Sequence, residues 1–235
     1  YRRQQKGIQS QYLKMNRKKK TTIVSENNLA FEINLSDYLD PGLFLDHRST
    51  RKLCRQWAKG HRFLNLFAYT GSFTCNAIAG GASQTTSVDL SGEYCDWTIR
   101  NFELNQFDPT RHAVIKDNCL SFVQHEAGKK RYDLIVCDPP TFSNSKQMKT
   151  SFSVTRDYPS LVRSCIKLLS PGGRLIFSTN AKTFTFDPQA GVPYAANLVV
   201  YGGANFKNTF NSFNFPSLIN LSVYSMQLFI ATCLS

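Results

Sequence analysis

The sequence lacks the features of a membrane-spanning, disulfide-stabilised or zinc-binding protein. It contains no run of about eighteen apolar residues, roughly the length that a membrane helix needs. The seven cysteines include no Cys-x-x-Cys pair, and the four histidines show no ligand spacing, which argues against disulfide frameworks and zinc sites. We therefore predict no membrane span and no metal site, and the unpaired cysteines indicate a reducing, cytoplasmic location.

Acidic residues are absent from the first twenty positions of a chain whose net charge is +12. Such a basic segment fits a polyanion, because neutralised phosphates release counterions; the alternative is a solvated tail without a partner. No cleavable signal is present and the chain starts at Tyr1 rather than Met, which indicates a piece of a longer protein. The residues predicted to bind RNA are Arg2, Arg3, Lys6, Lys14, Arg17, Lys18, Lys19 and Lys20.

From residue 63 onwards, short apolar runs alternate with segments of helical periodicity. This alternation is typical of βαβ units and predicts a doubly wound, mostly parallel α/β sheet of Rossmann-like type. A proline–glycine cluster at residues 170–173 is expected to end the last helix. Strands are predicted at 30–35, 63–67, 84–89, 113–115, 134–137 and 174–178, and helices at 72–79, 95–102, 120–124 and 158–169.

The sequence divides into three segments. Residues 1–40 form a basic N-terminal segment, and residues 41–187 form the α/β domain. Residues 188–235 form an atypical tail with a single charged side chain, Lys207, and many Asn, Ser, Phe and Gly residues. The tail can supply the remaining strands of the sheet; the other hypothesis is a change of reading frame near Asp187.

Ligands of doubly wound sheets bind beyond the carboxyl ends of the strands. After the first core strand, Gly71 allows a tight turn, and Thr70 or Ser72 can cap the following helix. The pattern is not Gly-x-Gly-x-x-Gly, which disfavours a dinucleotide and hence a nicotinamide-dependent oxidoreductase.

Acidic residues follow the next two strands. Asp89 is placed to accept hydrogen bonds from both hydroxyls of a ribose, and Asp117 from an adenine amino group. The alternative for each is a helix cap, with Ser91 as a competitor for Asp89. Polar positions at three successive strand ends favour a nucleoside pocket.

The most specific motif is Asp138-Pro-Pro-Thr-Phe142, directly after a buried strand. Two consecutive prolines fix the backbone and supply no N–H group. A rigid loop of this kind suits holding an extruded base by its hydrogen-bonding edge, with Phe142 available for stacking. The alternative is a surface turn.

These motifs, together with residues 4–7, 38–48 and 143–146, closely resemble the K half of the bifunctional large-subunit ribosomal RNA methyltransferase K/L family. The resemblance runs from about Arg3 to Phe186 and does not extend into the tail. It implies a class I methyltransferase that uses S-adenosylmethionine to form N7-methylguanosine in 23S ribosomal RNA. It also implies an RNA-binding hairpin element, of which residues 1–40 keep the end, and a second methyltransferase domain, fused or associated upstream.

The resemblance also assigns site residues. Arg48 could pair with the methionine carboxylate of the cofactor. His47 is a candidate base, although a lone histidine in a polar loop is more often structural and no orienting partner can be named. The implied catalytic residues are Asp138, Pro139, Pro140 and Phe142. The implied cofactor-binding residues are Phe44, Asp46, Arg48, Asn65, Phe67, Tyr69, Thr70, Gly71, Asp89, Asp117, Asn118 and Asp138.

The residues favour N7 methylation over carbon methylation. Formation of 5-methylcytosine needs a cysteine nucleophile, which related enzymes keep just after the fifth strand, where this chain has Ser178-Thr-Asn. Cys137 is expected to point away from Asp138 into the core. Methylation of another base position or another RNA stays open, although Thr141 stands where exocyclic-nitrogen enzymes place an aromatic residue. A catalytically inactive RNA-binding fragment is the other alternative.

Overall fold

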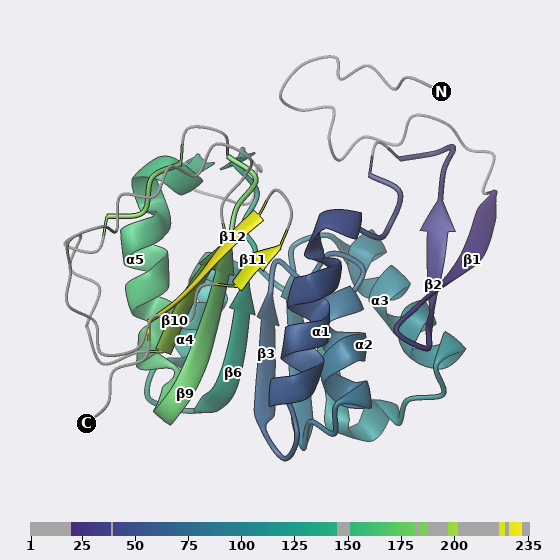
Figure 1. Cartoon of the computed structure of the whole chain (residues 1–235), viewed down its shortest axis with the longest axis horizontal. Helices are drawn as coiled ribbons and strands as arrows, with labels where there is room; N and C mark the ends of the chain where they lie inside the picture. Colours follow the sequence, from purple (N-terminus) through teal and green to yellow (C-terminus); the bar gives the residue numbers. More distant parts are fainter. Residues whose placement is uncertain are drawn as a thin grey trace.

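The computed structural model describes residues 20–38, 40–144, 151–181 and 184–187, together with the backbone of residues 197–201, 221–223 and 226–231. Its centre is an eight-stranded sheet in the order β11-β12-β10-β9-β6-β3-β4-β5 (Figure 1). The five core strands are all parallel to their neighbours. They are β3 (Arg62–Leu66), β4 (Gln84–Asp89), β5 (His112–Lys116), β6 (Tyr132–Cys137) and β9 (Leu169–Ser178).

Strands from residues 188–235 extend this sheet beyond β9. β10 (Asn197–Tyr201) pairs in parallel with β9, and β12 (Met226–Ala231) lies antiparallel between β10 and β11 (Leu221–Val223). The order of the core strands confirms the predicted doubly wound, mostly parallel sheet.

Helices cover both faces of the sheet (Figure 1). Apolar side chains alternate along the strands, so Phe63 and Val136 pack against the first helices, whereas Leu64 and Ile135 pack against the last two. On one face lie α1 (Arg48–Trp57), α2 (Ser72–Ala79) and α3 (Gly92–Leu104), and on the other α4 (Cys119–Glu126) and α5 (Val154–Lys167). Short elements complete the fold: η2 (Leu45–His47), η3 (Pro109–Arg111), and the paired strands β7 (Phe142–Ser143) and β8 (Phe152–Ser153).

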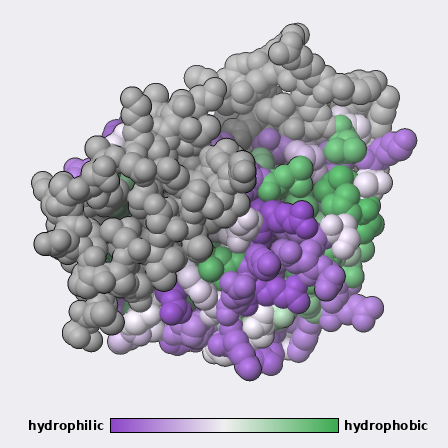
Figure 2. All heavy atoms as spheres, in the orientation of Figure 1, coloured by the Kyte–Doolittle hydropathy of each residue, from purple (hydrophilic) through white to green (hydrophobic). Residues whose placement is uncertain are grey.

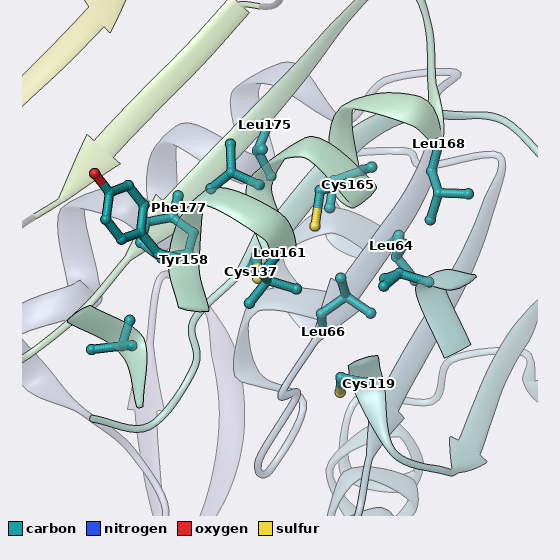
Figure 3. Packing of buried hydrophobic residues seen from close by; sticks show 14 of the residues in the cluster. Leu64, Leu66, Cys119, Cys137, Tyr158, Leu161, Cys165, Leu168, Leu175 and Phe177 are labelled. Carbon is teal, nitrogen blue, oxygen red and sulfur yellow. The ribbon is translucent and has the colours of Figure 1, made fainter. Parts of the chain in front are cut away.

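The larger part of the core lies between the sheet and α5. Cys137 from β6 and Cys165 from α5 are both fully buried and point into this layer beside Leu161 (Figure 3). The expectation that Cys137 turns away from Asp138 into the core is therefore confirmed.

The helix α1 was not predicted from the sequence. Thr50 and Cys54 are buried on its inner side, whereas Ser49 and Lys52 are exposed. The surface over α1 is mostly hydrophilic (Figure 2). The i, i+4 spacing of the buried positions was a usable signal, but the fully buried Arg51 obscured it, because a charged residue normally marks the outer face of a helix.

The boundaries of α5 and β9 differ from the prediction. α5 starts at Val154, not at Tyr158, because the backbone N–H of Ser153 donates to the Asp157 carboxylate (2.9 Å) and so forms a cap one turn earlier. Residues 170–173, which were predicted to end the last helix, are part of β9. The pairing of β6 with β9 shifts in register there, and this irregularity accommodates Gly172 at φ 72°.

A hairpin lies beside α3, outside the main sheet (Figure 1). It consists of β1 (Thr21–Glu26), which was not predicted, and β2 (Leu29–Asn34), which starts within a residue of the prediction. The turn residues Asn27 and Asn28 both have positive φ, as a two-residue type I′ hairpin turn requires. A side-chain amide at the C-terminal end of α3 pairs with the outer edge of β2: Asn105, the C-cap residue, bonds to both the N–H and the C=O of Ala30 (2.8 and 2.7 Å).

A buried ion pair joins this hairpin to the main domain. The Arg51 guanidinium donates two hydrogen bonds of 2.7 Å to the Glu26 carboxylate, and both side chains are at most 5% exposed. Arg51 also donates to the backbone C=O of Phe44 (2.8 Å). The Arg51 guanidinium and the Glu26 carboxylate are thus both hydrogen-bonded in the interior, as a buried bidentate ion pair requires.

We predict that Arg51→Ala lowers the free energy of unfolding in urea by about 3–5 kcal/mol, because it leaves the Glu26 carboxylate buried without its partner. Arg62→Ala is the control, since Arg62 pairs with Asp133 at the surface and is 45% exposed. It should cost less than about 1 kcal/mol. Equal losses for the two variants would contradict the structural role of the buried pair.

Candidate active site

The loop between β3 and α2 adopts a strained backbone conformation at the carboxyl edge of the sheet. Phe67, Tyr69 and Gly71 have φ values of 58°, 52° and 72°, and left-handed backbone at non-glycine residues clusters at functional sites. Hydrogen bonds hold the loop: the N–H of Phe67 donates to Cys119 Sγ (3.1 Å), and the N–H of Tyr69 to Asp89 Oδ2 (2.9 Å). A left-handed backbone that is held by hydrogen bonds before any ligand is present is expected at a ligand-binding loop.

Gly71 is the N-cap of α2 and packs tightly against α3. A Cβ atom at this position would lie 2.4 Å from Thr98 Cγ2. Neither Thr70 nor Ser72 caps α2, so that prediction is wrong. Thr70 is fully buried, and its hydroxyl donates instead to the C=O of Gly42 (2.6 Å), which ties the loop to the segment before α1.

Asn65 lies in β3 with its side chain turned into the layer beneath α2. Its amide donates to Thr74 Oγ1 (3.0 Å), and Thr74 in turn shares a hydrogen bond with Ser87 (2.8 Å). That Asn65 binds the cofactor stays a prediction. Its contacts instead indicate that the side chain supports the loop between β3 and α2.

Asp89 is the best-supported candidate for a ligand-binding carboxylate. One oxygen accepts from the N–H of Tyr69 and the other from the N–H of Ser91, both at 2.9 Å. Ser91, not Asp89, caps α3. Burial raises the pKa of Asp89 to about 6, against the lowering effect of these hydrogen bonds. A carboxylate has about four lone-pair positions, so Asp89 keeps acceptors for a ligand.

Asp117 lies at the end of the neighbouring strand. Its N–H donates to the C=O of Asp89 (3.0 Å), so the two acidic residues lie side by side at the ends of β4 and β5. Asn118 takes the helix-cap role, accepting from the N–H of Leu120 (2.9 Å). The Asp117 carboxylate therefore is not the cap of α4, and its Oδ1 accepts the local N–H of Asn118 (2.7 Å).

Asp138 follows β6 and lies close to residues from two other elements. Its Oδ1 accepts a short hydrogen bond from Ser178 Oγ (2.6 Å), and its Oδ2 lies 3.6 Å from His47 Nε2. Thr141 donates to the side chain of Asn180 (2.7 Å), which joins the same loops a second time. Pro139 is buried, Pro140 is half-buried, and Phe142 is 37% exposed.

Aromatic side chains connect the segment before α1 to the loop after β3. The ring of Phe44 lies 5.3 Å from that of Tyr69, which packs edge-on against Tyr94 at 4.7 Å. The Tyr69 hydroxyl donates to the C=O of Asp40 (2.9 Å), and burial raises the pKa of Tyr69. Asp46 in η2 and Arg48 at the start of α1 are both exposed.

The structure thus brings most of the predicted site residues to one edge of the sheet, and it adds Ser178 and a partner for His47. The predicted RNA-binding residues lie outside the described part of the chain, except Lys20, which is exposed. Among the described residues, no group of three or more His, Cys, Asp or Glu side chains could hold a metal ion. No helix in that part is long and apolar enough to cross a membrane.

A match to the S-adenosylmethionine-dependent methyltransferases covers residues 3–191. The chain belongs to this family, and its cofactor is S-adenosylmethionine. The crystal structure of SMU.776, described as a methyltransferase and solved with S-adenosylhomocysteine (SAH), covers 92% of this chain and 56% of its own, with a TM-score of 0.72 and 28% identity.

Curated relatives carry the same family resemblance. Ribosomal RNA large subunit methyltransferase K of Neisseria meningitidis is 47% identical over 83% of this chain and 55% of its own length. Methyltransferase K/L of Allochromatium vinosum is 47% identical over 82% of this chain and 26% of its own. These similarities confirm the resemblance to the K half. The chain spans only about a quarter to a half of these relatives.

The residues at the strand ends fit the cofactor chemically. Adenosine presents two ribose hydroxyls and an amino group, all hydrogen-bond donors, and the neighbouring carboxylates of Asp89 and Asp117 are acceptors. The half-buried aromatic rings of Phe44 and Tyr69 lie on the adjoining loops.

We predict that SAH binds more weakly as pH falls through about 6, the pKa of Asp89, with about tenfold lower affinity at pH 5 than at pH 7. Protonation removes acceptor strength from the carboxylate. The free energy of unfolding changes with pH in the opposite direction. Because the pKa of Asp89 is raised in the folded protein, its contribution to stability is present at low pH and is lost as pH rises through about 6. Calorimetric titration between pH 5 and 8 measures the effect, and an unchanged pH dependence in Asp89→Asn would contradict the assignment.

We also predict that Gly71→Ala destabilises the protein more than Gly172→Ala. Both glycines have φ 72°, but a Cβ at Gly172 meets no atom within 4 Å. Gly172→Ala should therefore cost only the backbone strain, about 1–2 kcal/mol. Thr98→Ser removes the clashing methyl group and keeps the hydroxyl that donates to Tyr69. It should recover part of the loss in Gly71→Ala, measured by urea unfolding, and no recovery would refute the steric cause.

Proposed function

We propose that this chain methylates N7 of a guanosine in 23S ribosomal RNA. The observation that carries the choice of N7 is the environment of Asp138: the side chain that reaches it from the end of β9 is the hydroxyl of Ser178. Among the described cysteines, all are buried, and Cys137 faces the core. A carbon-methylating enzyme needs a thiolate that can reach the base. This environment therefore supports methylation of a ring nitrogen.

The family membership and the names of the relatives support the RNA substrate. The basic residues of the N-terminal segment would contact the phosphates of RNA. In the same proposal, a second methyltransferase domain is fused or associated upstream, and the reaction takes place in the cytoplasm.

The cofactor would be held at three strand ends. Asp89 would accept the ribose hydroxyls, Asp117 the adenine amino group, and Arg48 would pair with the methionine carboxylate. The loop with Phe67, Tyr69 and Gly71 would line the methionine part, and its hydrogen bonds to Asp89 and Cys119 keep it in place before the cofactor binds.

S-adenosylmethionine supplies a methyl group on a sulfonium sulfur, which an in-plane lone pair such as that of guanine N7 can accept without loss of a proton. The protein therefore needs no general base and acts by orientation, which is worth up to about 7–11 kcal/mol. Asp138, 26% exposed, would accept from the N1–H and N2 amino groups of guanine, and its charge would offset the cation that forms on the ring. Phe142 would stack on the base from the same loop.

The test is transfer of a labelled methyl group from S-adenosylmethionine to unmodified 23S ribosomal RNA, with the product nucleosides identified by mass spectrometry. Labelled N7-methylguanosine supports the proposal. Another methylated nucleoside would keep the methyltransferase assignment and refute the choice of N7. An unlabelled product, with SAH still bound, would indicate an RNA-binding protein without catalysis.

For the same assay we predict that Asp138→Ala lowers the methyl-transfer rate at least about 100-fold and changes SAH affinity less than about threefold. The residue would contact the base, whereas Asp89 and Asp117 would carry the nucleoside of the cofactor. Asp138→Asn keeps one oxygen acceptor and removes the charge, so it should retain part of the activity. Normal turnover of Asp138→Ala would show that the base binds elsewhere.

A further inference from the structure

The carboxylate of Asp138 is flanked by a different residue on each oxygen. Ser178, which is fully buried at the end of β9, donates to Oδ1 at 2.6 Å. His47, which is 8% exposed at the end of η2, presents Nε2 at 3.6 Å from Oδ2. The three side chains come from segments far apart in sequence and meet only in the folded protein.

The position of His47 is fixed by packing. Its ring lies edge-on against the ring of Phe73 in α2, at 5.5 Å between centroids. The residue is also the N-cap of α1, whose Arg51 is held by Glu26. His47 is therefore anchored on the face of the sheet that carries α1 and α2, and only its Nε2 side reaches toward Asp138.

The distance of 3.6 Å is longer than an ordinary hydrogen bond, which is at most about 3.2 Å. In substrate-free enzymes, hydrogen bonds that serve catalysis are often long and shorten when the substrate binds. Because Ser178 already donates to Oδ1, a shortened contact between His47 Nε2 and Oδ2 would give each oxygen of Asp138 a side-chain donor.

We propose that His47 and Ser178 are positioning residues that set the rotation of the Asp138 carboxylate, so that its remaining lone pairs face the edge of the target base. This inference rests on the proposed function. A carboxylate with one side-chain donor can turn about its Cβ–Cγ bond, whereas one with two donors on opposite oxygens cannot. Such pre-orientation lowers the cost of reaching the reactive arrangement.

Matched substitutions separate positioning from structural support. His47→Phe keeps a ring against Phe73 and removes the N–H donor. His47→Gln supplies an uncharged N–H donor at a similar reach to Nε2. Ser178→Ala removes a single oxygen from a fully buried site. His125→Phe is the control for the histidine change, because His125 is exposed on α4, on the opposite face of the sheet.

The measurement is the single-turnover rate of methyl transfer to unmodified 23S ribosomal RNA by the full chain, at saturating cofactor, with SAH affinity measured in parallel. We expect His47→Phe and Ser178→Ala each to lower the rate on the order of tenfold or more, with SAH affinity changed less than about twofold. His47→Gln should return most of the rate. In an Asp138→Asn background, the His47→Phe change should have a much smaller effect, because both residues act through the same carboxylate.

An unchanged rate in His47→Phe, or a loss of equal size in the wild-type and Asp138→Asn backgrounds, would overturn the inference while leaving the proposed function intact. A loss that Gln does not restore, accompanied by a matching fall in SAH affinity, would also overturn it, because it indicates a structural defect. Failure of the wild-type chain to transfer methyl groups, by contrast, would overturn the proposed function itself and the inference with it.

Discussion

The carboxylate of Asp89 is the contact on which the arrangement of the site depends. It accepts the N–H of Tyr69 from the loop after β3 and the N–H of Ser91 from the start of α3. A left-handed tyrosine costs on the order of 1–3 kcal/mol, and this hydrogen bond offsets part of that cost. A backbone hydrogen bond from the Ala68 N–H to the C=O of Val88 (3.0 Å) holds the same loop against the end of β4, and the Asp89 carboxylate adds the contact that fixes Tyr69.

The helices and strands could be predicted where their own residues carry a clear hydrophobic pattern and clear residues at the ends. The bounds of α2 and β4 agree with the prediction, because Gly71 and Gly80 flank α2 and the capping residue Ser91 follows β4. The helix α1 was missed because its buried Arg51 breaks the apolar pattern. No local signal reveals that this charge meets Glu26 in a hairpin far away in the sequence.

The site was predictable residue by residue but not as a set of contacts. The motifs identified Asp89, Asp117 and Asp138, because strand ends of a parallel sheet converge on one edge. The sequence could not provide a partner for His47, since its neighbour Asp138 follows a strand in the middle of the sheet. It also could not show that the Asn65 side chain turns toward Thr74 instead of the ligand edge.

The amide groups of α3 also change the character of the hairpin. Two-stranded hairpins are marginally stable on their own, but here Asn101 and Asn105 occupy positions that a third strand would fill, by bonding to the backbone of β2. The amide proton of Ala30 is consequently shielded by a side chain of a helix. Its exchange with solvent deuterium is therefore expected to report on the opening of the C-terminal end of α3, and the hairpin and that helix are expected to exchange as one cooperative unit.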